Sequence, residues 1–287
     1  MYHDYSQEEL RAYCRSSIES LEIWARRLIH EKMAENYGKN YINATDNNGE
    51  WIIKKDIRKH VFQMIDKKPL RFSKAVDTLF LEHIIYFLCN PKWYNSMFKP
   101  AMDYAFPQGC EELREFLKRL IPIRNALSHA NPISVRQAEQ ALCYSHDFVE
   151  GLLAYYKEVG EERMWNVPRI IRVTDSRGNE FLPPMDSVAS FTKRITPEFY
   201  VKDSYSIEIE VDPAFSPDDY TICWAKLGNS YIKYPHNSKH LFVTFSDDDI
   251  GQSMIIKCDI VSKKNWHRFF DSDDTLQLIV TVLPLNN

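Results

Sequence analysis

The spacing of hydrophobic residues changes near residue 165 of this 287-residue chain. Before that point apolar side chains recur every three or four positions, as on one face of an α-helix; after it they recur every second position, as in a β-strand. The chain also exceeds the length at which a single hydrophobic core usually splits. We therefore predict an α+β multidomain protein, with an all-α domain over residues 1–162 and an all-β domain over residues 163–287.

The first domain is predicted to be a bundle of five longer helices. The first helix begins at Ser6, where Glu9 has the spacing that completes a capping box, and ends near Gly38. The others are expected over residues 55–66, 73–89, 110–130 and 135–160, with Ser134 as the last N-cap. Three prolines between residues 90 and 109 limit that stretch to short helices.

The second domain is predicted to consist of about seven short strands, a number typical of a β-sandwich. A hairpin is expected around Arg177–Gly178–Asn179, and the stretch SYSIEIEVDP places Ile207, Ile209 and Val211 on one face. Further strands are expected over residues 220–228, 230–235, 239–246, 253–262 and 275–284.

Trp224 precedes Cys258 by 34 residues, and the stretch DDDIGQSMIIKCDIVS leads into that cysteine. This arrangement resembles the strand C tryptophan and the D-x-G region before the second cysteine of immunoglobulin-like domains. The strand that would carry the first cysteine has Ile207 and Ile209 instead, so no disulfide between the sheets is expected. Trp224 and Cys258 are expected in the core, and the Asp247–Asp249 run is read as a turn before a strand rather than a calcium site.

Composition and cysteine usage favour an intracellular protein, and no cofactor is expected. The chain is 44% hydrophobic and 26% charged, which is ordinary for a globular protein, and it has no apolar run long enough to span a membrane. Its N-terminus lacks the apolar centre of a secretory signal, so we expect a cytoplasmic location. The six cysteines form no C-x-x-C pair, so no structural zinc site is expected. No metal-binding residue is predicted elsewhere in the chain.

The formal net charge of −4 is unevenly distributed. Residues 161–287 hold 14 Lys and Arg against 19 Asp and Glu, which leaves 22 against 21 for residues 1–160, so a polyanion would meet the first half. Residues 54–74 hold eight Lys or Arg and two Asp, with Phe62 and Phe72 available for base stacking. The run is either a solvated helix face or a track for an RNA backbone; the RNA contacts predicted there are Lys54, Lys55, Arg58, Lys59, Lys67 and Lys68.

The stretch IPIRNALSHANPIS gathers unusual polar groups on one predicted helix. At about 100° per residue, Arg124, Asn125, Ser128 and His129 fall within an arc of about 140°. The apolar positions of the same helix fall on the opposite side and are expected to face the core; they are Phe116, Leu120, Ile123 and Leu127. Pro122 is expected to bend the helix just before the polar arc.

Arg124-Asn125-x-x-x-His129 resembles the R-x4–6-H motif of HEPN domains, which are helical bundles found in RNA-targeting toxins and defence proteins. The polar residue after the arginine and the capped helix that follows the motif also resemble that family, over roughly residues 6–160. The resemblance implies a homodimer in which two copies of the motif form one RNA-cleaving site. It implies catalytic roles for Arg124 and His129, in prokaryotic antiviral defence or toxin control.

These residue types suit RNA cleavage without a metal ion. A histidine takes up or releases a proton near neutral pH, and an arginine binds phosphate oxygens with a permanent charge. Asn125 is expected to orient His129 or bind phosphate, and Ser128 to contact RNA. Because the 2′-hydroxyl is the nucleophile, the products would be 2′,3′-cyclic phosphate and 5′-hydroxyl ends.

Other interpretations of the same residues remain open. Asn125, Ser128 and His129 can instead satisfy one another at an inert dimer seam, because many HEPN-like domains are non-catalytic dimerisation or scaffold modules. His83 beside Glu82 is read as a satisfied core histidine rather than a metal ligand. The β domain carries no catalytic pattern, so it either braces the dimer or binds a protein trigger or inhibitor.

Overall fold

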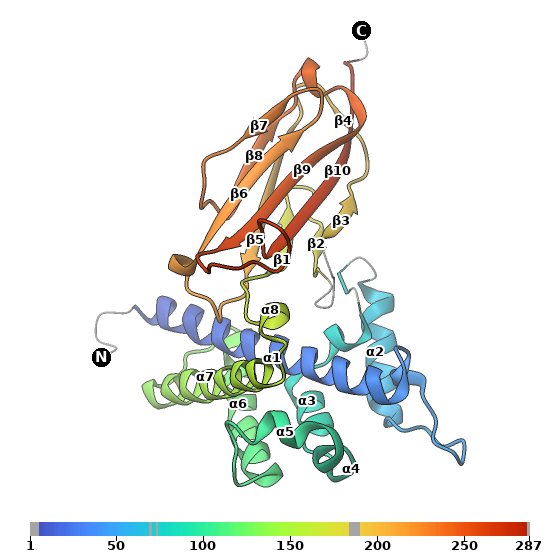
Figure 1. Ribbon diagram of the computed structural model, residues 1–287, viewed down its shortest axis with the longest axis vertical. Helices are drawn as coiled ribbons and strands as arrows, with labels where there is room; N and C mark the ends of the chain where they lie inside the picture. Colours follow the sequence, from blue (N-terminus) through green and yellow to red (C-terminus); the bar gives the residue numbers. More distant parts are fainter. Residues whose placement is uncertain (1–5, 69–70, 73, 184–189, 286–287) are drawn as a thin grey trace. The chain divides into compact units, whose positions relative to one another are not determined.

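The computed structural model describes residues 6–68, 71–72, 74–183 and 190–285. The chain divides into two compact units between Asn166 and Val167. The first unit is helical and the second consists of β-sheets (Figure 1). The boundary lies four residues beyond the predicted one, because the short helix α8 (Glu162–Trp165) belongs to the helical unit.

The helical unit is organised around its first helix, α1 (Gln7–Tyr37). The predicted capping box is present, because the Ser6 hydroxyl accepts the Glu9 amide at 3.2 Å and the Glu9 carboxylate accepts the Ser6 amide at 2.8 Å. The remaining helices are α2 (Lys55–Lys67), α3 (Leu81–Leu88), α4 (Pro91–Trp93), α5 (Lys99–Met102), α6 (Cys110–Ser128) and α7 (Val135–Glu158). Short turns of other helix types are η1 (Tyr41–Asn43), η2 (Ala75–Thr78) and the π-helix η3 (Tyr94–Phe98).

The prediction of one continuous helix over residues 73–89 is wrong; Ser73 itself lies outside the described residues. The chain forms η2, becomes extended at Leu79 and Phe80, and enters α3 at Leu81. Side chains supply the backbone hydrogen bonds that a continuous helix would have supplied. Nδ1 of His83 accepts the Phe80 amide at 3.2 Å, and the Arg26 guanidinium donates to the Leu79 carbonyl at 2.6 and 3.0 Å.

The core of the helical unit lies between α1 and α7. Trp24 and Leu28 of α1 are fully buried, and the Trp24 ring lies 6.2 Å from that of Tyr156 on α7. Helix α7 passes so near Ala105 that a Cβ atom at Gly151 would lie 2.8 Å from the Ala105 Cβ. Close packing at that point therefore requires glycine.

The β unit contains two sheets. One has the strand order β2-β1-β5-β8, with bounds Glu180–Phe181, Ile170–Asp175, Ser204–Val211 and His240–Thr244. The other has the order β3-β10-β9-β6-β7, with bounds Phe191–Arg194, Asp274–Leu283, Gly251–Ser262, Tyr220–Leu227 and Tyr231–Lys233. The short strands β3 and β4 (Phe199–Tyr200) both run parallel to β10, and the remaining pairs are antiparallel.

Both sheets contribute to one hydrophobic core, which is the two-layer arrangement of a β-sandwich (Figure 1). Ile207 and Ile209 of β5 face Trp224 and Cys258 across this core, and all four are buried. Trp224 and Cys258 are also direct register partners on β6 and β9. The prediction that this tryptophan and cysteine lie in the core is confirmed.

The Asp247–Asp249 run forms the short 3₁₀ turn η5 before β9, as predicted. The carboxylate of Asp249 is buried and lies 2.7 Å from the Lys226 ammonium on β6. Both charges are thereby neutralised within the fold. Among the helices of the described residues, none is sufficiently long and apolar to cross a membrane.

Candidate functional site

The predicted polar arc lies at the C-terminal end of α6. Asn125, Ser128 and His129 are exposed and Arg124 is half-buried. On the other side of the helix Leu120, Ile123 and Leu127 are almost fully buried, and Phe116 is half-buried. The predicted separation of polar and apolar faces is confirmed, and α6 continues without a break through Pro122 to Ser128.

Arg124 is held in place by an acidic residue of α1 that the sequence analysis did not identify. Nε of Arg124 lies 3.3 Å from Oε1 of Glu22, whose side chain is only 7% exposed. The other oxygen of Glu22 lies 2.7 Å from the Arg26 guanidinium, which also binds the Leu79 carbonyl. One buried carboxylate therefore positions two arginines, and the ion pair uses the Nε edge of Arg124. The Nη1 atom of Arg124 lies 3.5 Å from Asn125 Oδ1, which is a weak hydrogen bond. The outer edge of the guanidinium can therefore still bind an anion.

An aromatic cluster supports the same guanidinium from a second direction. Arg124 Cζ lies 5.1 Å from the centroid of the Phe80 ring, within the range of a cation–π contact. The His83 ring stacks on Phe80 at 5.7 Å and 12°, and the His60 ring lies 4.5 Å from Phe80 and 4.6 Å from His83. Residues from α2, α3 and α6 thus meet beside Arg124.

His83 is neutral near pH 7 for a structural reason. Its Nδ1 accepts the Phe80 amide, so that nitrogen carries no proton while the hydrogen bond exists. Burial, and then the neighbouring His60, lower its pKa. His83 is partly exposed and caps α3, so the prediction of a core histidine is correct about its satisfied hydrogen bonding and wrong about its full burial.

A small cavity of about 70 Å³ borders Arg124 between α1 and α6. Its wall includes Arg15, Glu19, Glu22 and Ser128. Nη2 of Arg15 donates to the Leu127 carbonyl at 2.5 Å and so caps the end of α6. The Ser128 hydroxyl donates to the Arg124 carbonyl at 2.9 Å, which leaves its oxygen free to accept but not to donate.

The basic run is a helix with separate apolar and charged faces. Ile57 and Val61 of α2 are buried, whereas the lysines predicted to contact RNA are exposed; they are Lys54, Lys55, Lys59, Lys67 and Lys68. Arg58 is half-buried because its guanidinium stacks on the exposed Trp51 ring at 3.9 Å. Phe62 is 47% exposed, and Phe72 is half-buried. Since α2 also carries His60, it reaches the Phe80 cluster that supports Arg124.

Metal ligands are not gathered at this site. Within the part of the chain that the structure describes, no three His, Cys, Asp or Glu side chains are grouped so that they could hold a metal ion. His60 and His83 adjoin each other, but His60 Nε2 is engaged with the Thr78 carbonyl at 2.9 Å and His83 Nδ1 with Phe80. The groups that remain available for chemistry are the Arg124 guanidinium and the exposed His129 imidazole.

Comparison with known proteins gives no assignment for this site. No protein-family model, no curated protein and no solved structure matches the chain significantly.

Proposed function

We propose that this chain is a metal-independent endoribonuclease of the HEPN type, active as a homodimer. The observation that carries the proposal is the fixed Arg124 guanidinium, held on one edge by buried Glu22 and on one face by Phe80. Arg124 lies near the C-terminal end of α6, where His129 is exposed. An arginine that binds phosphate and a histidine that can transfer protons are the residue types that cleavage of a phosphodiester without a metal ion requires.

The reaction proceeds by attack within the RNA strand. A base removes the proton of a ribose 2′-hydroxyl, the 2′-oxygen bonds to phosphorus, and the 5′-oxygen leaves with a proton from an acid. One His129 imidazole serves as base, and that of the second subunit serves as acid. Arg124 neutralises the charge that grows on the phosphate oxygens, and Asn125 orients the imidazole or the phosphate.

RNA approaches along α2 in this proposal. Its exposed lysines bind the phosphate backbone without regard to sequence, and Phe62 and the Trp51–Arg58 pair offer surfaces for unpaired bases. Ser128 contributes a hydrogen-bond acceptor at the α6 end. DNA binds these groups as well, but it lacks the 2′-hydroxyl and is not cleaved.

The fold of each unit supports the family resemblances. The R-N-x-x-x-H stretch ends α6, and a capped closing helix, α7, follows after NPIS, as in HEPN domains. In the β unit, β1, β5 and β8 oppose β6, β9 and β10, with Trp224 beside Cys258, and this arrangement suits an immunoglobulin-like sandwich. We assign that unit the recognition of a protein trigger or inhibitor, and the whole chain a role in cytoplasmic antiviral defence or toxin control.

A second candidate function is a non-catalytic dimerisation or scaffold protein whose β-sandwich binds a partner. The contacts of Arg124 support this alternative, since an arginine that bridges α1 and α6 and stacks on Phe80 also has a structural use.

Incubation with end-labelled single-stranded RNA separates the two candidates. The wild-type protein should cleave the RNA, His129→Ala should slow the cleavage by about 10²- to 10⁴-fold, and Arg124→Ala by about 10²- to 10³-fold. Arg119→Ala is the control, because Arg119 is an exposed arginine of the same helix that binds Tyr144. Equal cleavage by His129→Ala and the wild type would remove the proposed site, and folded dimers that never cleave RNA would favour the scaffold.

A further inference from the structure

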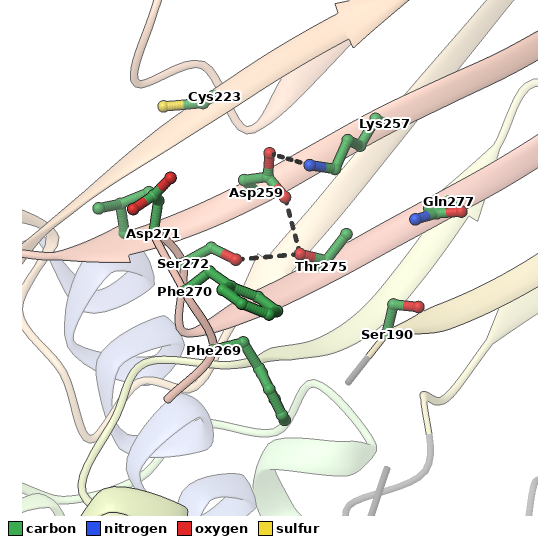
Figure 2. Close-up of a pocket in the computed structure, with 11 residues that line it drawn as sticks. Ser190, Cys223, Lys257, Asp259, Phe269, Phe270, Asp271, Ser272, Thr275 and Gln277 are labelled. Carbon is green, nitrogen blue, oxygen red and sulfur yellow. Dashed lines mark hydrogen bonds and ion pairs between the residues drawn. The ribbon is translucent and has the colours of Figure 1, made fainter. Parts of the chain in front are cut away.

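A second site lies in the β unit, on the face of the larger sheet that points away from the core. Cys223, Asp259 and Thr275 are register partners on β6, β9 and β10, so they form one row across three strands. Lys257 and Gln277 form the next row on β9 and β10. Together with the chain between β9 and β10 they line an open cavity of about 450 Å³, within the size range of small-ligand pockets (Figure 2).

The wall opposite the sheet is a tight turn that exposes an aromatic ring. Phe269 and Ser272 exchange backbone hydrogen bonds of 2.9 and 2.7 Å, which leaves Phe270 and Asp271 at the tip. Phe270 is fully exposed and has a φ of +32°, a conformation that is uncommon for a bulky residue. A single exposed hydrophobic residue is ordinary, but a fully exposed phenylalanine in a disfavoured conformation beside a cavity needs a reason.

The turn is held rigidly by a buried carboxylate. Asp273 accepts the Ser262 amide at 2.6 Å and the Arg268 amide at 3.0 Å, and its side chain has no exposed surface. Its own amide donates to the Ile260 carbonyl at 2.8 Å. Because the turn is already ordered, presenting Phe270 and Asp271 to a partner costs little further conformational entropy.

The side chains around the cavity favour a positively charged ligand. The Lys257 ammonium lies 2.8 Å from Asp259, which also accepts the Thr275 hydroxyl at 2.7 Å, so the two opposite charges in the floor offset each other (Figure 2). Burial and the neighbouring Asp259 raise the pKa of the Cys223 thiol, so it stays neutral. What remains is the Asp271 carboxylate and the face of the Phe270 ring, and both attract positive charge.

The net negative charge of the whole β unit also favours a cationic ligand. Residues 161–287 carry 14 basic and 19 acidic groups; omitting Glu161, Glu162 and Arg163 leaves 13 against 17 for residues 167–287. A basic partner is therefore attracted to this unit over a longer range. Within the turn itself, the Arg268 guanidinium stacks on the Phe269 ring at 5.0 Å.

We propose that this cavity docks an extended peptide segment of a partner protein through one arginine side chain. The guanidinium pairs with Asp271 and stacks on Phe270, while the partly exposed Gln277 pairs with the peptide backbone. Arginine is preferred over lysine because its planar group both stacks on a ring and binds a carboxylate through two nitrogens. The inference concerns the β unit alone and does not depend on RNA cleavage.

The test uses the full chain and a fluorescent nonapeptide of glycine and serine with arginine at its centre. We expect saturable binding in a polarisation assay, and binding about fivefold weaker, the size of one exposed cation–π contact or ion pair, when citrulline replaces arginine. Phe270→Ser and Asp271→Asn should each weaken binding to a similar degree. Both positions are exposed, so circular dichroism should show the variants folded.

Matched controls remove the same groups elsewhere on the β unit. Phe242→Ser deletes another exposed phenylalanine, and Asp248→Asn another exposed carboxylate. Neither should change the affinity. Equal binding of the arginine and citrulline peptides, equal losses in Asp248→Asn and Asp271→Asn, or no saturable binding would each overturn the proposal.

Discussion

Glu22 and Arg124 form an ion pair between α1 and α6, with 3.3 Å between the carboxylate and Nε. Glu22 is buried and also pairs with Arg26, so one acidic side chain joins two arginines that lie on different helices. Replacing Glu22 with Gln removes the charge and keeps the size. The free energy of unfolding should fall by about 1–3 kcal/mol, the usual range for losing a hydrogen bond to a charged group.

Urea denaturation followed by circular dichroism at the helical band measures this loss. Glu35→Gln is the control, because Glu35 lies on the same helix with a side chain that is 67% exposed. Its effect should stay within about 0.5 kcal/mol. Equal effects of the two substitutions would show that the Glu22 pair does not stabilise the helical unit.

His83 should make the helical unit less stable in mild acid. Its pKa is lowered in the folded chain from the ordinary value of about 6.5, so the unfolded chain binds the proton more readily. The contribution of neutral His83 is therefore complete above pH 6.5 and is lost as the pH falls through that value toward the lowered pKa. Protonation also abolishes the acceptor at Nδ1 that caps α3.

His83→Gln isolates this effect, since glutamine at the same position can accept the Phe80 amide but does not titrate. We expect the difference in melting temperature between pH 7.5 and pH 5.5 to be smaller in the variant than in the wild type. An identical pH dependence would mean that His83 is not held neutral by the fold.

The lysines of α2 should control how strongly salt weakens RNA binding. For single-stranded RNA, each lost phosphate contact reduces the magnitude of the negative slope of log affinity against log salt by about 0.7. In the His129→Ala background, replacing Lys55 and Lys59 with Gln should therefore reduce the slope by about 1.4. Lys233 and Lys239 of the β unit, both exposed, provide the matched double variant, which should leave the slope unchanged.

The sequence was sufficient to predict the polar face at the end of α6, because the residues that form this face are close in sequence and follow the helical period. It did not reveal Glu22 or Phe80, since nothing local relates them to Arg124; only the packing of α1 and α3 against α6 brings them together. The break at Leu79 and Phe80 was missed for a similar reason. Both residues continue an apolar helical pattern, and the hydrogen bonds that stabilise the break come from Arg26 and His83.

In the β unit, alternation predicted the longer strands, and the resemblance to immunoglobulin-like domains predicted that Trp224 and Cys258 lie in the core. The short strands β3 and β4 were not predicted, because two to four residues cannot establish a period of two. Their parallel pairing with β10 is a tertiary property. The turn at Phe270 and Asp271 was also missed, since its shape depends on the buried carboxylate of Asp273.

A site shared between two subunits should allow defective chains to complement each other. Arg124→Ala and His129→Ala are each expected to be nearly inactive alone. When they are mixed and allowed to exchange subunits, the heterodimer regains one Arg124 and one His129 but still lacks the second imidazole, so cleavage should rise above that of either variant alone and stay well below that of the wild type. Activity that does not rise on mixing, although exchange is shown by native mass spectrometry, would confine the site to one chain or exclude it.

The chemical identity of the new RNA ends tests the central claim most directly. Mass spectrometry of a single-stranded RNA after incubation with the metal-free wild-type protein should find 2′,3′-cyclic phosphate and 5′-hydroxyl ends, and His129→Ala should produce almost none. Products with 3′-hydroxyl and 5′-phosphate ends, or cyclic ends formed equally by His129→Ala, would contradict an endoribonuclease that uses Arg124 and His129.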